Sequence, residues 1–255
     1  NHSLDPSRAK KIARILEAIP SLKPNEFKTQ SKLFSSCLAI IPIRGETISY
    51  KNISLLETTI KSLKKTNLIS KIIVSTDNEQ TAAKATQYGV EHILRPSKLS
   101  SESTSLAEVL EFTLKEIENQ GEFFDVIAVA EEIYPFRDKN VIEEMINTMN
   151  SGKSDTIYAA WEEKRITWYG NKDDLEILGG KSWIIKKHDN SDNIITSLSG
   201  YLLLLKPSQI RSKSLFSSIT EAYVINDPMA VVTIHNEKEL IKVIDLFQNS
   251  LETEH

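Results

Sequence analysis

The residues of greatest chemical interest follow one apolar stretch near the start of the chain. Leu38–Ile43 leads directly into Arg44-Gly45, and a short polar loop then leads to Lys51-Asn52. Glycine and successive backbone N–H groups form anion-binding turns, and basic side chains neutralise phosphate. A strand that ends this way is typical of nucleotide sites at the carboxyl edge of an α/β sheet. We therefore expect Arg44 and Lys51 to contact the phosphates of a ligand.

Other kinds of chemistry have weaker support in the sequence. The only cysteine, Cys37, begins an apolar stretch, which favours a packed thiol over a nucleophile. No nucleophile-elbow or P-loop pattern is present. The five histidines show no metal-ligand spacing: His2, His92, His188, His235 and His255. A formal net charge of -4 without a large basic block argues against a nucleic-acid partner.

Composition places the chain among ordinary globular proteins. Its 255 residues can bury one large core, and 40% of them are hydrophobic and 26% charged. No apolar run approaches the roughly 20 residues of a membrane span. We see no signal peptide. The expectation is a cytoplasmic protein without a membrane partner.

Strands and helices alternate through the middle of the chain in a way that positions these residues. The apolar patterns predict strands at 38–43, 71–75, 90–94, 125–130 and 155–160, and helices at 55–66, 77–89, 104–119 and 138–149. We expect Asp77 to cap the second helix, with Gln80 completing a capping box. Continuous apolar strands separated by helices predict an α/β fold with a mostly parallel, doubly wound sheet.

The ends of the chain and one internal segment depart from this rhythm. We expect an N-terminal helix and linker at 1–36, and the main domain at 37–250. Residues 162–196 predict a small β-rich insertion, which includes a strand-like piece at Ser182–Lys186. The closing elements are expected to be strands at Tyr201–Leu205 and Val231–Ile234 and a helix at Glu237–Phe247.

Five segments, taken in order, resemble the motifs of one enzyme family. Residues 39–53 are similar to the family's A-I-I-P-A-R-G-G-S-K-G-I-P-R-K-N-I, and residues 72–79 to its V-V-S-T-D-D-E. Residues 95–105 resemble R-P-x-x-L-x-x-D-T-x-S, residues 131–137 take the place of Q-P-T-S-P-L-R, and residues 199–201 resemble N-G-x-x-Y. The family is that of the acylneuraminate cytidylyltransferases, which activate sialic acids and related acid sugars with CTP.

The resemblance implies a fold and a reaction. The fold would be that of the nucleotide-diphospho-sugar transferases, with the β-rich insertion as a dimerisation arm. In the reaction, the anomeric hydroxyl of a sialic-acid-like 2-keto sugar acid attacks the α-phosphate of CTP, and pyrophosphate leaves. The implied partners are CTP or another nucleotide, the acid sugar and a second copy of the chain. Mg²⁺ is the implied cofactor of an active enzyme.

The resemblance also assigns roles to individual residues. Arg44 and Lys51 would be catalytic cations, because charge must be neutralised as pyrophosphate departs. The nucleotide would be bound by Arg44, Gly45, Lys51, Asn52, Arg95, Thr104 and Ser105. The sugar would be bound by Glu131, Arg137 and Tyr201.

The chain departs from the family where triphosphate and metal would bind. Its first loop is two residues shorter and lacks the central lysine and second arginine, and Glu46 would repel a triphosphate. Thr233 and His235 replace a pair of metal-binding aspartates, and hard Mg²⁺ prefers oxygen ligands. Asp227 is close by in sequence, but a following proline favours a turn there. The metal ligands are therefore unassigned.

These departures leave other functions open. One is a degenerate, non-catalytic domain that keeps the fold for dimerisation or scaffolding. Another is a related transferase that uses a different nucleotide or sugar. Aromatic residues in and beside the insertion are compatible with packing of a small β subdomain or with a homodimer arm that lines the partner's sugar site: Trp161, Trp168, Tyr169 and Trp183. We expect a homodimer.

Overall fold

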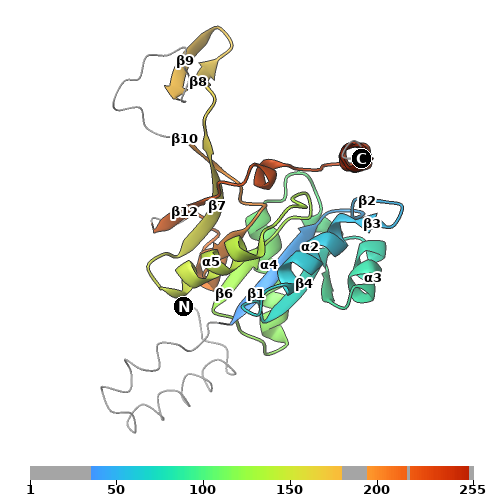
Figure 1. Cartoon of the computed structure of the whole chain (residues 1–255). Coiled ribbons are helices and arrows are strands. Elements are labelled where there is room, and N and C mark those ends of the chain that lie inside the picture. The colour runs from blue at the N-terminus through green and yellow to red at the C-terminus, as the bar shows by residue number, and fades with distance from the viewer. Residues whose placement is uncertain (1–35, 180–193, 217–218, 253–255) are drawn as a thin grey trace.

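The computed structural model describes residues 36–179, 194–216 and 219–252 (Figure 1). Almost all of the expected N-terminal helix and linker lies outside these ranges, as does the strand-like piece at Ser182–Lys186. No helix in the part of the chain that is described has both the length and the apolar character needed to cross a membrane.

Within the described ranges, eight strands form one mixed sheet at the centre of the fold. Seven strands follow the order β10-β7-β11-β6-β1-β4-β5, and β12 pairs with β7. Four neighbouring strands are parallel: β6 (Val126–Val129), β1 (Cys37–Ile43), β4 (Lys71–Thr76) and β5 (Glu91–Leu94). The predicted mostly parallel α/β sheet is thus confirmed, and β1 lies in its middle.

The second half of the sheet is less regular. It contains β7 (Thr156–Glu163), β10 (Ile194–Ser197), β11 (Leu203–Leu205) and β12 (Thr220–Val224). β11 is antiparallel to both neighbours, β6 and β7. The strand predicted at Tyr201–Leu205 is shorter in the structure, where it spans Leu203–Leu205. The predicted strand at Val231–Ile234 is wrong, because a 3-10 turn, η3 (Pro228–Val231), occupies its start.

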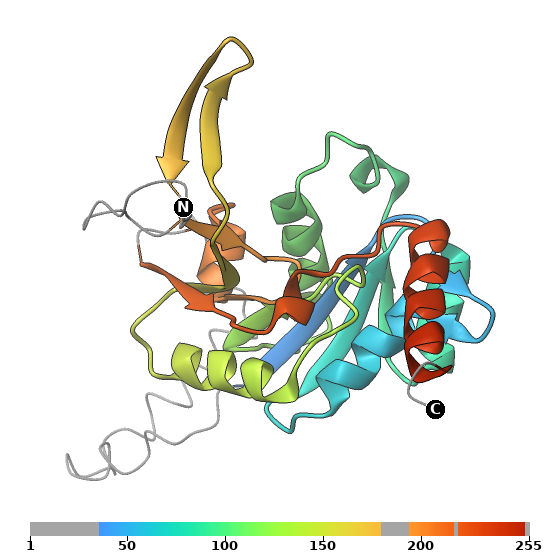
Figure 2. The same cartoon turned by 45° about the horizontal axis from the view of Figure 1, so that its top comes forward.

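Helices cover both faces of the sheet, as Figure 2 shows. α2 (Leu55–Lys64), α3 (Glu79–Gln87) and α5 (Lys139–Asn150) contribute to the core on one face, and α4 (Leu106–Asn119) and α6 (Pro207–Arg211) to the core on the other. Alternate residues of β1 enter the two cores: Ala39 and Ile41 pack on one side, Leu38 and Ile40 on the other. A strand apolar on both sides must be covered on both sides, so its carboxyl end is held rigidly.

The helix after β4 is capped differently from the prediction. Asn78, not Asp77, is the N-cap of α3, and its side chain accepts a hydrogen bond from Thr81 N at 2.9 Å. Asp77 instead accepts from Gly45 N at 2.8 Å. The sequence predicts that Asp77 caps the helix. In the structure its carboxylate instead bonds to Gly45, which is distant in the chain.

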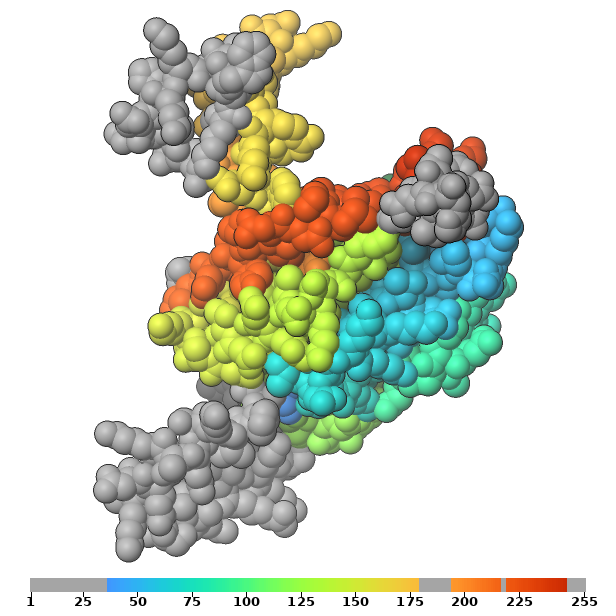
Figure 3. Space-filling view, in the orientation of Figure 1, coloured from blue at the N-terminus to red at the C-terminus, as the bar shows by residue number. Residues whose placement is uncertain are grey.

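The β-rich insertion stands away from the body (Figures 1 and 3). It contains the antiparallel pair β8 (Thr167–Asn171) and β9 (Asp174–Gly179). We call this pair the arm. Large apolar side chains are exposed along it: Trp168, Tyr169, Leu175, Ile177 and Leu178. The β-rich character predicted for 162–196 is confirmed over the described part, and Trp183 lies outside it.

Candidate functional site

A cavity of about 230 Å³ opens at the carboxyl edge of the sheet. Four of the residues predicted to bind ligand line it together: Arg44, Arg95, Thr104 and Glu131. They come from different parts of the chain, after β1, after β5, before α4 and after β6. Parallel strands bring their carboxyl ends to the same edge, which is where α/β sheets place their ligand sites.

Arg95 forms the buried wall of this cavity. Its guanidinium donates to the carbonyl oxygens of Ser75 at 2.7 Å and Ile43 at 3.0 Å, so it ties the ends of β4 and β1 together. Its Nε, also buried, has no hydrogen-bond partner among the described residues. Burial lowers the pKa of Arg95, while Asp77, 3.8 Å away, opposes that effect. A cation with a spare donor is thus fixed beside the cavity.

The turn after Arg44 is held by bonds to α3 and to the end of β4. Gly45 has a φ of 72°, a left-handed conformation that favours glycine. Its N–H donates to Asp77, and its carbonyl accepts from Thr81 Oγ1 at 2.9 Å. Burial raises the pKa of Asp77, but hydrogen bonds led by the Gly45 N–H, with a smaller contribution from the Arg95 charge, outweigh it and leave that pKa below its usual value. Asp77 is therefore an ionised anchor for the loop.

A second carboxylate, Glu132, holds the other end of the same loop. It is 6% exposed, and it accepts hydrogen bonds from the Thr47 hydroxyl and from Ile48 N, the latter at 3.1 Å. Burial raises its pKa, and these two bonds partly oppose the rise. The sequence prediction missed Glu132. Its only signal was a second glutamate directly after the buried strand β6.

Lys51 and Asn52 lie apart from the cavity lining. They form the tip of a hairpin between β2 (Ser49–Tyr50) and β3 (Ile53–Ser54), and both are exposed. Lys51 has a φ of 53°, and its Nζ lies 5.1 Å from the centre of the Tyr50 ring. The last helix, α7 (Glu237–Glu252), packs against this hairpin. The structure therefore separates Lys51-Asn52 from the residues that gather around the cavity.

Arg137 and Tyr201, predicted to bind the sugar, are buried beneath the site. Arg137 donates to five oxygens, including the Tyr201 carbonyl at 2.7 Å and Thr59 Oγ1 at 3.1 Å. Burial lowers the pKa of Arg137 to about 10. The Tyr201 hydroxyl accepts from Asp138 N at 2.8 Å. Both side chains are used inside the protein, where they fix the loop that carries Glu131.

Glu131 itself reaches the cavity because Gly200 leaves room for it. A Cβ on Gly200 would lie 2.9 Å from the Glu131 carboxyl carbon and 2.6 Å from a ring carbon of Tyr134. Burial raises the pKa of Glu131, and the charges of Arg137 and His235 act against that rise. A carboxylate that is partly buried in a polar cavity is a good acceptor for a ligand hydroxyl.

The two hydroxyl residues predicted to bind nucleotide differ in their position relative to the cavity. Ser105 is the N-cap of α4 and forms a capping box with Glu108, so its hydroxyl is already bonded. Thr104 lines the cavity, and its hydroxyl lies 2.8 Å from Ser101 Oγ. Of this pair, only Thr104 therefore belongs to the cavity.

The stretch in which Thr233 and His235 replace the family's metal-binding aspartates runs beside the site. Ile234 N donates to the Ile133 carbonyl at 2.9 Å, which places Thr233 and His235 next to the Glu131 loop. His235 Nε2 lies 3.0 Å from Thr233 Oγ1. In the described ranges, no three His, Cys, Asp or Glu side chains form a group that could hold a metal ion. Among the described residues, this stretch therefore lacks the carboxylate pair that hard Mg²⁺ prefers.

One carboxylate oxygen of Asp227 is already engaged in this geometry. Its carboxylate accepts from Met229 N at 2.9 Å and caps the short turn η3. The turn expected from the Asp-Pro sequence is thus present.

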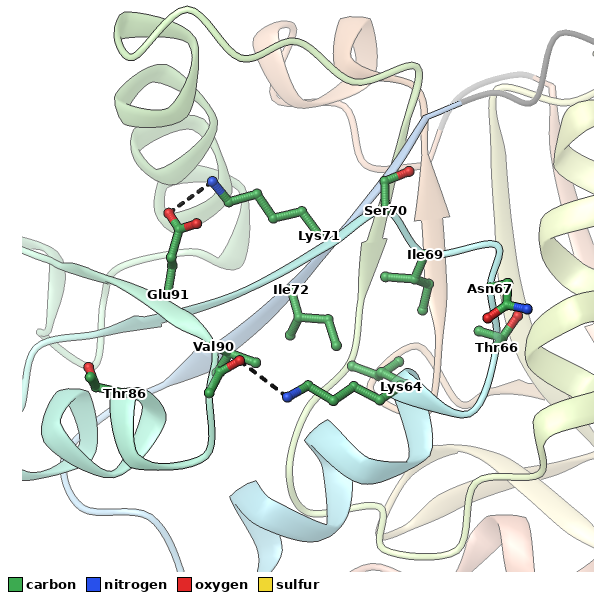
Figure 4. A pocket seen from close by; sticks show the side chains of 12 residues that line it. Lys64, Thr66, Asn67, Ile69, Ser70, Lys71, Ile72, Thr86, Val90 and Glu91 are labelled. Atoms are coloured by element: carbon green, nitrogen blue, oxygen red, sulfur yellow. Dashed lines mark hydrogen bonds and ion pairs between the residues drawn. The ribbon is translucent and has the colours of Figure 1, made fainter.

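A second hollow, of about 670 Å³, lies at the opposite end of the sheet (Figure 4). Its two lysines are already paired. Lys71 contacts Glu91 at 2.8 Å and Glu122 at 2.5 Å, and Lys64 donates to the Tyr88 carbonyl at 3.0 Å. It lies at the amino end of β4 and shares no residue with the first cavity. We place the candidate site at the carboxyl edge.

The sheet order and the cavity at its carboxyl edge are those of an α/β protein with its ligand site in the usual place for such folds. A family model described as cytidylyltransferase matches residues 48–167. The chain is 25% identical over 244 residues to the N-acylneuraminate cytidylyltransferase of Escherichia coli O18:K1:H7 (strain RS218 / NMEC), which covers 83% of this chain and 55% of that protein. The chain is therefore similar to cytidylyltransferases over this part of its sequence. It spans about half the length of that curated relative.

Solved structures agree on the fold. CMP:2-keto-3-deoxy-manno-octonic acid synthetase complexed with CTP superposes with a TM-score of 0.62 at 10% identity, covering 85% of this chain and 100% of that one. The 4-diphosphocytidyl-2C-methyl-D-erythritol synthase of Anaerococcus prevotii DSM 20548 gives 0.60 at 12% identity, with coverage of 86% and 99%. At these identities the likeness concerns the fold alone.

Proposed function

We propose that this chain binds a cytidine nucleotide in the cavity at the carboxyl edge and transfers CMP from CTP to a sialic-acid-like 2-keto sugar acid. The observation that carries the proposal is the convergence of Arg44, Arg95, Thr104 and Glu131 on one cavity at the end of β1. Two cations and two oxygen-bearing side chains suit a ligand with both phosphate and hydroxyl groups.

Three of these side chains have a role in the proposed reaction. The sugar hydroxyl loses its proton to solvent and forms a bond to the α-phosphorus as the bond to pyrophosphate breaks, and Arg44 stabilises the charge that moves onto the phosphate oxygens. Arg95 supplies a second, buried positive charge. Glu131 accepts a hydrogen bond from the sugar. Because the stretch of Thr233 and His235 lacks the carboxylate pair that Mg²⁺ prefers, we route no step through a metal.

Nucleotide binding tests the proposal first. Calorimetric titration with CTP and CMP should give binding to the unmodified chain, and Arg44→Ala should weaken it by about 1.5–3 kcal/mol, the usual cost of a charge-assisted hydrogen bond. Arg165→Ala is the matched control, because Arg165 is an exposed arginine bound to Glu163 at the base of the arm. Equal affinity of Arg44→Ala and the unmodified chain would remove Arg44 from the site.

Pyrophosphate release then tests the reaction. We expect release with CTP and a 2-keto sugar acid such as N-acetylneuraminate, and no release when either is omitted. A panel of other nucleoside triphosphates and sugar acids separates CTP transfer from a related reaction with another nucleotide or sugar.

A second candidate function is a non-catalytic domain that retains the nucleotide fold for dimerisation or scaffolding. The observation that favours it is the state of the loop after β1, whose Gly45, Thr47 and Ile48 N–H groups donate to side chains of the protein itself. Binding of CMP without any pyrophosphate release from CTP would support this function, whereas turnover would exclude it.

A further inference from the structure

The loop between β1 and β2 directs its backbone donors inward. Three of its N–H groups donate to side chains on three other segments: Gly45 to Asp77 at 2.8 Å, Thr47 to Thr81 at 3.1 Å, and Ile48 to Glu132 at 3.1 Å. Loops of this kind bind phosphate through such N–H groups. Here the protein supplies its own acceptors, and two of the three are carboxylates.

Glu132 resembles a bound anion more than an ordinary surface glutamate. It comes from the segment after β6 and is 6% exposed. One of its oxygens accepts from the Thr47 hydroxyl and the other from Ile48 N. A carboxylate that takes adjacent donors of one loop with both oxygens has the charge and hydrogen-bonding role of a phosphate group.

A phosphate that approached these donors would have to displace Glu132. Displacement would leave a buried carboxylate without its hydrogen bonds, which is costly for a charged group. The nearby cation, Lys84, would only partly offset that cost. Glu46, exposed on the same loop, would add repulsion that grows with the number of phosphates. The penalty thus falls mainly on nucleotides with a long phosphate chain.

We propose that Glu132 is a specificity-determining positioning residue, which occupies the anion position of the loop and makes the site favour a nucleoside monophosphate over a triphosphate. The proposal rests on the cytidine-nucleotide site proposed above. It makes CMP, or the CMP portion of a larger ligand, the preferred occupant, and it makes entry of CTP depend on displacement of Glu132.

The ratio of CTP affinity to CMP affinity tests this role. Calorimetric titrations with each nucleotide would use the unmodified chain, Glu132→Gln and the control Glu122→Gln. Glutamine keeps an acceptor for Ile48 N but removes the negative charge. Glu122 pairs with Lys71 at the opposite end of the sheet. We expect Glu132→Gln to raise the ratio about tenfold, with CMP affinity changed less than about twofold, and Glu122→Gln to leave it unchanged.

The outcomes separate the two proposals. CMP binding with the same ratio in a folded Glu132→Gln protein would overturn the role of Glu132 and leave the nucleotide site standing. No binding of either nucleotide to any of the three proteins would overturn the nucleotide site, and the role of Glu132 with it. Should Glu132→Gln fail to fold, the unmodified chain still decides, because a tenfold preference for CTP over CMP would contradict the inference.

Discussion

Two carboxylates hold the loop after β1 from opposite ends, and their environments shift their pKa values in opposite directions. Asp77 has its pKa lowered, because hydrogen bonds led by the Gly45 N–H, with a smaller contribution from Arg95, outweigh its burial. Glu132 has its pKa raised, because burial outweighs the bonds from Thr47 and Ile48. The ionised form of Asp77 is therefore favoured by folding, whereas that of Glu132 is disfavoured and is held in place by donors of the loop.

Asp77 should give the folded state a pH-dependent stability. A carboxyl whose pKa is lower in the folded state contributes stability that is fully present above its unfolded pKa of about 3.9 and is lost as pH falls through the folded value. Asp77→Asn should thus cost about 1–2 kcal/mol of unfolding free energy at pH 7 and progressively less below about pH 4.

Urea unfolding from pH 3 to pH 7 measures the difference in unfolding free energy between the unmodified chain and Asp77→Asn. Asp174→Asn, at an exposed carboxyl in the arm, is the control. A cost of Asp77→Asn that is the same at pH 3 as at pH 7 would show that its charge contributes nothing. Glu131 and Glu132 act with the opposite sign, because carboxyls with raised pKa values lose stability as pH rises through the window above about 4.3.

At the scale of the elements, the sequence predicts the part of the fold that rests on local patterns. β1, β4 and β6 are short apolar runs between helices, and their burial on both faces follows from that composition. β12 (Thr220–Val224) was missed because its five residues show neither strict alternation nor a continuous apolar run, and it pairs only with β7. Val231–Ile234 has strand-forming residues, but Pro228 begins a 3-10 turn before it and Ile234 bonds to the Ile133 carbonyl.

The residues of the candidate site also differ in whether local sequence could predict them. Arg44 and Arg95 were predictable, because each follows a strand of the parallel half and the carboxyl ends of such strands meet. Glu132 and the true partner of Asp77 were not, because their bonds span 32 or more residues. Two residues that suit a ligand by type, Arg137 and Ser105, proved to be engaged by nearby backbone or cap contacts.

The arm exposes two aromatic side chains that predict how the protein assembles. Trp168 is 55% exposed and Tyr169 is 69% exposed on a hairpin that stands clear of the body. Aromatic side chains of this kind are enriched in the cores of protein interfaces. We expect a homodimer through the arm at about 10 µM. Replacing both aromatics by serine should weaken the dimer about tenfold or more.

Sedimentation equilibrium measures this association. Lys172→Ser, in the turn of the same hairpin, is the control and should leave the dimer intact. A monomeric unmodified chain at tens of micromolar would remove the arm as a dimer interface.

At the scale of the whole molecule, segments far apart in sequence close one edge of the sheet. The segment that follows β12, orange-red in Figure 3, crosses the body towards α7 and passes beside the Glu131 loop. It brings Thr233 and His235 to the place where the resemblance implies metal-binding carboxylates. The cavity and its two cations, Arg44 and Arg95, are thus present. The carboxylates expected for a metal are replaced, and the N–H donors of the loop after β1 already bond to the protein itself.

Pyrophosphate release from CTP and N-acetylneuraminate should therefore be slow in the unmodified chain. Thr233→Asp together with His235→Asp should strengthen Mg²⁺-dependent nucleotide binding, because two carboxylates give the cation hard oxygen ligands. Asn236→Asp is the control, since aspartate can keep the cap of α7 that Asn236 provides by accepting from Glu239 N at 3.0 Å. It adds one carboxylate without restoring the pair, so it should not strengthen binding. Rapid Mg²⁺-dependent turnover by the unmodified chain would contradict this reasoning, and Asp227, which now caps η3, would be the first residue to substitute.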